Sequence, residues 1–230
     1  MAKSADEERK EFLGRMYDQM FNDINTHILV VWQSAGVLVA AFAVLALVEK
    51  AIIPMDVATA LLVLIAAWLL AHLEDASYWY NRNLVIIANI ERQFLRPNDL
   101  REIHYYFGKH RAVGKMIDHL RIQYALGIGV AVIMLLLHFL TRVLPGVGAP
   151  WANFEAVRAL PYVVTLGGAV MIALLRKRCS DKYREFLSNS PGADVDTSGV
   201  TYGVGHPAHN PPQFQVAPKA ATPPAADGAK

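Results

Sequence analysis

The stretch "SYWYNRNLVIIANIERQFLRPND", residues 77–99, decides how this chain folds. It follows an apolar segment long enough to cross a membrane, yet it carries polar residues among regularly spaced apolar ones. The positions at steps of three and four residues are Ala76, Trp79, Asn83, Ile86 and Ile90. This spacing is typical of one face of an α-helix, and Pro97 then disfavours helical geometry in the residue before it. The stretch therefore predicts a helix that leaves the membrane without a break and ends in a tight turn.

The composition is typical of a membrane protein, because 54% of the 230 residues are hydrophobic and 18% are charged. Four apolar segments approach the roughly 20 residues that a helix needs to cross the hydrocarbon core. They cover residues 28–48, 57–73, 124–140 and 159–175. We therefore expect two membrane helices within residues 28–73 and two within 124–175. The first apolar segment is too long for a cleavable signal peptide, so all four helices should be retained.

Lysine and arginine are unevenly distributed between the segments that flank these helices. The first, third and fifth segments hold 19 of these residues, and the second and fourth hold 3. Because positive residues are retained on the cytoplasmic side, we expect both termini and the central segment to be cytoplasmic. The single cysteine, Cys179, excludes a disulfide within one chain. The pattern predicts a multi-pass protein of a bacterial inner membrane, embedded in the lipid bilayer and without an external domain.

The segments outside the membrane also have helical spacing. Residues 74–123 predict a helical hairpin, because apolar positions from Ile103 to Tyr124 repeat the heptad spacing of the first arm beyond Pro97. Residues 1–27 predict an amphipathic helix that starts at a capping box of Ser4 and Glu7 and continues into the first span. Residues 176–187 predict a short helix, and the Pro-, Ala- and Gly-rich residues 188–230 a disordered tail. The expected fold is all-α, with four membrane helices that continue into a cytoplasmic helical bundle.

Two polar residues interrupt the apolar faces of the hairpin. Asn83 in the first arm and His110 in the second are almost equally far from the turn, so they can lie at one level. A polar layer in an apolar seam sets the register of the helices, and a histidine there can respond to pH. A purely structural layer is the favoured interpretation. Asn83 should face the bundle, and its neighbour Arg82 should face away from it.

Aromatic and basic residues mark the expected membrane boundary. Tyr78, Trp79 and Tyr80 follow the second span and are predicted to form an aromatic belt at headgroup depth, in preference to a cage for a ligand cation. A basic cluster follows the fourth span. It is interpreted first as a stop-transfer signal and second as a contact for anionic lipids, and its members are Arg176, Lys177 and Arg178.

The sequence contains no motif of an enzyme that we could identify. It has no metal-binding HExxH pattern, no phosphate-binding loop and no GxSxG motif, so we assign no catalytic, cofactor-binding or metal-binding residue and expect no cofactor. The eight basic residues of the central segment are offset by six acidic ones, which argues against binding of nucleic acid. The leading hypothesis is a non-enzymatic membrane protein whose cytoplasmic helices mediate assembly into a homo-oligomer or docking of a cytoplasmic partner.

Two alternatives remain open at the level of the sequence. The first is a channel subunit that forms a pore by oligomerisation. Its candidate lining residues are Gln33, Ser34, Thr59 and His138. The second is a membrane enzyme that acts at the level of the cytoplasmic headgroups. Its candidate residues are His72, Glu74, Asp75 and Tyr78.

Overall fold

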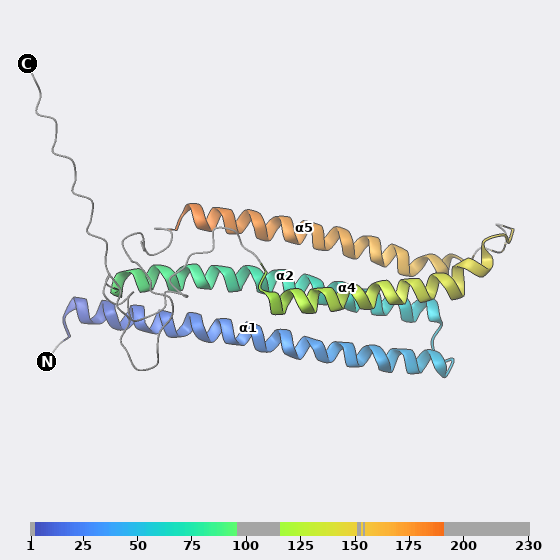
Figure 1. The fold of residues 1–230 in the computed structure, drawn as a ribbon, viewed down its shortest axis with the longest axis horizontal. Coiled ribbons are helices and arrows are strands. Elements are labelled where there is room, and N and C mark those ends of the chain that lie inside the picture. The colour runs from blue at the N-terminus through green and yellow to red at the C-terminus, as the bar shows by residue number, and fades with distance from the viewer. Residues whose placement is uncertain (1–2, 96–115, 151–152, 154, 191–230) are drawn as a thin grey trace, which may run out of the picture.

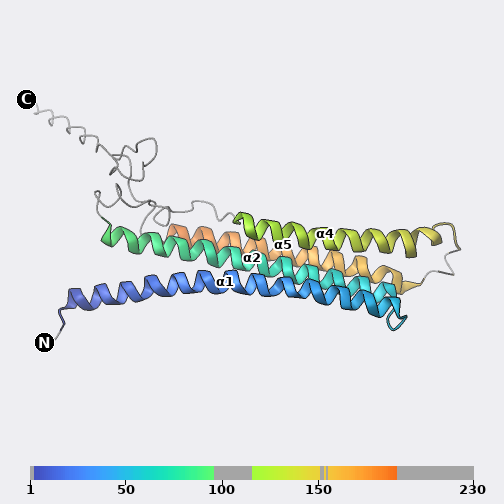
Figure 2. The ribbon, with the colours of Figure 1, turned by 60° about the horizontal axis from the view of Figure 1, so that its bottom comes forward.

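The computed structural model describes residues 3–95, 116–150, 153 and 155–190. Within these residues the regular elements are helices, and four long helices lie side by side along one axis (Figures 1 and 2). They are α1 (Ala5–Glu49), α2 (Met55–Phe94), α4 (Asp118–His138) and α5 (Leu160–Ser188). The all-α prediction is confirmed for this part of the chain. We call the end that holds residues 50–54 and 139–159 the short-loop end, and the opposite end the long-loop end.

Three helical segments are long and apolar enough to cross a membrane, among the residues that the structure describes. The first is α2. The second, Asp118–Gly146, consists of α4, the π-helical turn η1 (Phe139–Val143) and the 3-10 turn η2 (Leu144–Gly146). The third, Ala156–Ser188, consists of the 3-10 turn η4 (Ala156–Ala159) and α5. The first predicted span, residues 28–48, lies in α1, and many of its side chains are outside the described residues.

The N-terminus of α1 has the predicted capping box. The Ser4 hydroxyl accepts a hydrogen bond from the Glu7 amide at 3.3 Å, and the Glu7 carboxylate accepts one from the Ser4 amide at 2.8 Å. These hydrogen bonds satisfy two donors that the helix cannot pair internally, and they lower the pKa of Glu7. From this cap α1 runs for 45 residues without a break, so the predicted amphipathic helix and the predicted first span form one helix.

The helix α2 lies among the other three and contacts each of them. Its predicted apolar stripe is therefore wrong in part: Trp79 is 37% exposed, whereas Asn81 and Val85, outside the stripe, are fully buried. The physical reason is that a central helix is covered on several sides, so its buried surface does not follow one face. The prediction for Arg82 is also wrong, because its guanidinium lies over the Phe186 ring of α5, 5.6 Å from the centroid.

Toward the long-loop end, α1 and α2 share an apolar cluster of Ile24, Leu84 and Ile87. Beside this cluster the Tyr17 hydroxyl donates a hydrogen bond to the Glu91 carboxylate at 3.1 Å. Burial and the negative charge of Glu91 raise the pKa of Tyr17 to about 12, so this hydroxyl keeps its proton and remains a donor. The two helices thus stay packed well beyond the residues that were predicted to lie in the membrane.

The predicted continuous second arm of the hairpin, from residue 103 to residue 124, is wrong at its membrane-side end. Helix α4 begins only at Asp118, and Ile117 is extended, with φ −69° and ψ 158°. Ile117 is β-branched, and the side chains of Met116 and Ile117 pack against the cluster that contains Leu73 and Leu120 instead of continuing a helix. The carboxylate of Asp118 then favours a helix start at this point. Residues 96–115 of the predicted hairpin lie outside the described residues.

Candidate functional site at the short-loop end

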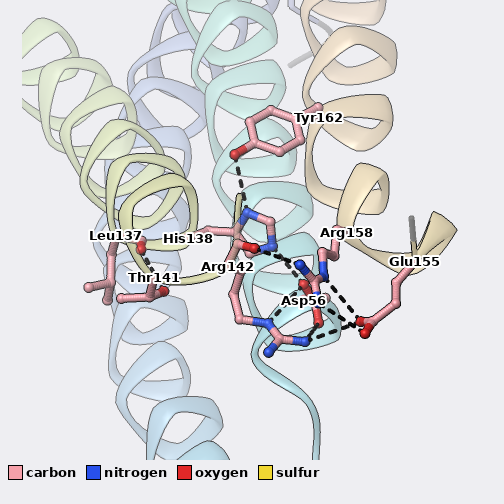
Figure 3. A network of polar contacts seen from close by, with 8 residues as sticks. All are labelled: Asp56, Leu137, His138, Thr141, Arg142, Glu155, Arg158 and Tyr162. Atoms are coloured by element: carbon pink, nitrogen blue, oxygen red, sulfur yellow. Dashed lines mark hydrogen bonds and ion pairs between the residues drawn. The ribbon is translucent and has the colours of Figure 1, made fainter. Parts of the chain in front are cut away.

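Six polar side chains meet at the short-loop end (Figure 3). They come from separate segments of the chain: the first turn of α2, the end of α4, the turns η1 and η4, the residue before η4, and the first turn of α5. In this order the residues are Asp56, His138, Arg142, Arg158, Glu155 and Tyr162. The packing of three helices therefore assembles this polar network.

Local sequence explains where several of these side chains lie. Pro54 is the N-cap of α2, and Asp56 lies in the first helical turn, where the helix dipole favours a negative charge. His138 and Arg142 are four residues apart, so both can reach toward the same helix. The turn between them is π-helical, a rare geometry that is frequent at functional sites.

The inner part of the network is a buried chain of three side chains. The Asp56 Oδ1 and His138 Nε2 atoms are 2.9 Å apart, and both side chains are fully buried. His138 Nδ1 is 3.2 Å from the Tyr162 hydroxyl. Because an ionised carboxylate only accepts hydrogen bonds, it holds the imidazole proton on Nε2. The imidazole therefore lies between the Asp56 carboxylate and the Tyr162 hydroxyl and connects them.

The outer part of the network pairs two arginines with two carboxylates. Arg142 Nη2 donates to Asp56 Oδ2 at 3.0 Å, so Asp56 binds both Arg142 and His138. Arg158 donates to both oxygens of Glu155, at 2.9 and 3.1 Å, and a third nitrogen donates to the Arg142 carbonyl at 3.1 Å. The hydrogen bonds and charge of Arg158 lower the pKa of Glu155. With Arg142 Nη2 3.6 Å from Glu155, the network joins α2 to the connection before α5.

A cavity of about 620 Å³ lies next to this network. It is bounded by the connection between η1 and α5, and Glu155, Arg158 and Tyr162 belong both to its wall and to the polar network. The other lining residues are Val143, Gly146, Val147, Gly148, Ala149, Pro150, Asn153 and Ala159. The volume falls within the range of small-molecule sites, roughly 300–1,000 Å³, and the mainly apolar lining with a few convergent polar groups is also typical of them.

The structure describes one of the two residues of the predicted polar layer. Asn83 is 1% exposed and thus faces the bundle, as predicted, and its side-chain oxygen is buried without a hydrogen-bond partner among the described residues. Its predicted partner His110 lies outside the described residues. The pairing of Asn83 with His110 stays a prediction.

The predicted boundary residues lie near the middle of the bundle. The rings of Trp79 and His27 are stacked, with centroids 6.4 Å apart, and Tyr78 meets Trp79 edge to face at 5.5 Å. The Arg82 guanidinium also lies over the Trp79 ring, at 5.1 Å, so a cation of the protein itself contacts this ring. Tyr80 packs against the apolar cluster shared by α1 and α2.

The basic cluster after the fourth predicted span is exposed on α5. It comprises Arg176, Lys177 and Arg178. The side chain of Arg176 lies 4.0 Å from the Glu74 carboxylate of α2. Contact of this cluster with anionic lipids stays a prediction.

The structure describes some of the residues of the two alternative hypotheses. Thr59 and His138 are fully buried in the single chain, and the side chains of Gln33 and Ser34 are outside the described residues. His72 is stacked on Trp68, with ring centroids 5.5 Å apart. Among the described residues, no group of three His, Cys, Asp or Glu side chains is suited to hold a metal ion.

The network at the short-loop end was not predicted from the sequence. Arg142 and Arg158 are two of the three basic residues in the second and fourth flanking segments, and His138 was predicted only as a candidate lining residue of a pore. One signal was present in the sequence. Asp56 directly precedes the predicted span 57–73 and His138 lies near the end of the predicted span 124–140, so both are at the same predicted membrane boundary. Ionisable groups in or near the membrane usually pair with one another. In comparisons with known proteins, no family model, curated protein or solved structure matches this chain.

Proposed function

We propose that this chain is a non-enzymatic membrane protein with four membrane-spanning helices, whose helices outside the membrane mediate assembly. The assembly partner is either a further copy of the chain or a cytoplasmic protein. One observation carries the proposal: α1 and α2 have 45 and 40 residues. At about 1.5 Å per residue they are about 68 and 60 Å long, roughly twice the 30 Å thickness of the hydrocarbon core.

The packing of these helices toward the long-loop end supports a rigid extension beyond the bilayer. Leu84 and Ile87 of α2 are buried against Ile24 of α1. The Asn89 side chain of α2 also donates a hydrogen bond to Ser190, just after α5, at 2.8 Å. Phe12, on the predicted apolar face of α1, is nevertheless exposed in the single chain. Its exposure makes Phe12 an accessible position at which contact with another protein can be tested.

Crosslinking in native membranes tests the assembly. Phe12→Cys in a Cys179→Ser background should yield adducts with a second copy or a partner after treatment with a bifunctional maleimide, identified by mass spectrometry. Ile52→Cys, an equally exposed position at the short-loop end, is the matched control and should yield none. A chain that is monomeric by native mass and forms no adduct through Phe12→Cys would remove the basis of the proposal.

The proposed orientation places both termini in the cytoplasm of a bacterium and the short-loop end on the outer side of its inner membrane. The excess of Lys and Arg in the first, third and fifth segments supports it. In intact cells, a membrane-impermeant maleimide should label Ile52→Cys and should label Lys182→Cys only after permeabilisation. Labelling of Lys182→Cys alone in intact cells would show the reverse orientation.

The channel and enzyme hypotheses receive no support from the arrangement of the described residues. A pore through one chain would need polar side chains along an open path, whereas His138 is bound to Asp56 in a closed network. A channel formed between chains would appear as ion conductance when the protein is reconstituted in planar bilayers.

A further inference from the structure

The cavity at the short-loop end has a largely apolar wall, and exposed apolar residues lie beside its lining residues in the sequence. Its wall includes Val143, Val147, Ala149, Pro150 and Ala159. Large apolar side chains around it are exposed, namely Leu144, Val147, Val157 and Leu160. They lie at the end of two helical segments that are long and apolar enough to cross a membrane. Apolar side chains at the end of such segments are suited to contact with hydrocarbon chains.

The polar edge of the cavity has the geometry that recognises an anionic group. Arg158 binds the Glu155 carboxylate through two nitrogens, the paired arrangement that arginine forms with carboxylates and phosphates. Arg142 reaches the same carboxylate from the other side. Figure 3 shows both guanidinium groups directed at Glu155, whereas Tyr162 lies beyond the His138 ring.

Glu155 is the member of the network that can leave most easily. Its side chain is 52% exposed, and its backbone is extended, ahead of the first residue of η4. Asp56, by contrast, is buried and bound to both Arg142 and His138. A rotation of Glu155 into water would free two nitrogens of Arg158.

The charges of the network favour a ligand with one negative charge. With Glu155 in place, Arg142 and Arg158 are paired with the carboxylates of Asp56 and Glu155. When Glu155 turns to water, Arg142 remains paired with Asp56 and Arg158 is left with an uncompensated positive charge. One anionic group restores neutrality at the cavity edge.

We propose that this cavity binds an amphiphile from the membrane that has a single anionic head and a hydrocarbon chain, and that Glu155 occupies the head position when the ligand is absent. The head binds Arg158, and the chain lies along Val143, Val147 and Pro150. The buried hydrogen bonds from Asp56 through His138 to Tyr162 hold the opposite wall in place. This proposal is independent of the assembly role proposed above.

Native mass spectrometry of the full-length protein in neutral detergent tests the proposal with two matched probes, palmitic acid and 1-hexadecanol. They have chains of equal length and differ in the charge of the head. Palmitate should bind at least about tenfold more tightly than hexadecanol, because a charge-assisted pair with arginine contributes about that factor or more. Equal binding of the two probes by the wild-type protein would overturn the proposal.

Two variants separate the roles of the charged residues. Arg158→Gln should lose the preference for palmitate, whereas Glu155→Gln should bind palmitate about tenfold more tightly than the wild type, since it removes the competing charge. Arg121→Gln is the control, because Arg121 of α4 forms an exposed ion pair with Asp118 and belongs to neither the cavity wall nor the polar network. A misfolded variant cannot produce tighter binding, so the expected increase cannot arise from loss of the fold. Weaker binding of palmitate by the Glu155→Gln variant would contradict the role assigned to Glu155.

Discussion

Asp56→Ala should lower the free energy of unfolding by about 3–5 kcal/mol, the usual cost of removing one partner from a buried ion pair. The substitution leaves the buried His138 Nε2 proton without an acceptor and removes the main partner of Arg142. For a chain of this size the loss corresponds to a decrease in Tm of roughly 6–20 °C. Thermal unfolding of the purified protein in detergent, followed by circular dichroism, measures the change.

Asp118→Ala is the matched control for this experiment. Asp118 also lies in the first turn of a long helix, so both substitutions remove the same favourable interaction with a helix dipole. Its side chain is 92% exposed, and its ion pair with Arg121 is at the surface. We expect a change of at most about 1 kcal/mol, the usual value of an exposed ion pair. Equal effects of the two substitutions would show that the network at the short-loop end adds no stability.

Gly168→Leu should destabilise the packing of α5 on α2 by at least about 1–3 kcal/mol, because overpacking forces helices or side chains apart. A Cβ atom on Gly168 would lie 2.9 Å from the Cβ of Ala67, which is closer than side chains approach one another. Small residues at such positions allow close contact between membrane helices. The free energy of unfolding in detergent is the measurement.

Gly167→Leu provides the comparison, since a Cβ atom at Gly167 meets nothing within 4 Å. Both substitutions replace glycine by leucine in adjacent helical residues, so the gain in helix propensity, about 0.8 kcal/mol, is the same. The difference between the two variants therefore isolates the clash with Ala67. Ala67→Gly should restore part of the stability of a Gly168→Ala variant. Failure of both effects would mean that α5 does not approach α2 at this residue.

Helix caps, helical segments and helix ends could be predicted from the sequence, because they depend on residues close together along the chain. The capping box at Ser4 uses groups three residues apart, and the helical spacing after Leu73 reflects the period of one helix. Pro97 also indicated correctly that α2 ends nearby, at Phe94. Such signals depend on neighbours along the chain, so the extended path of α1 and α2 could be predicted without knowledge of the packing.

The errors arose where distant residues compete with local preference. The spacing around Ile117 favours a helix, but its packing near Leu73 leaves it extended. Arg82 was assigned to the solvent from its place opposite an apolar stripe, yet α5 covers that side of α2 and brings Phe186 to its guanidinium. A single helical period carries no information about how many neighbours a helix has.

By itself the sequence determined that the described chain is helical and has helices long and apolar enough to cross a membrane, because helix period and apolar length are properties of contiguous residues. Only the tertiary structure decided that Asp56, His138 and Tyr162 form one buried chain beside a cavity. These residues are separated by 82 and 24 positions. Their proximity follows from the way α2, α4 and α5 pack, and neither helical period nor apolar length encodes that packing.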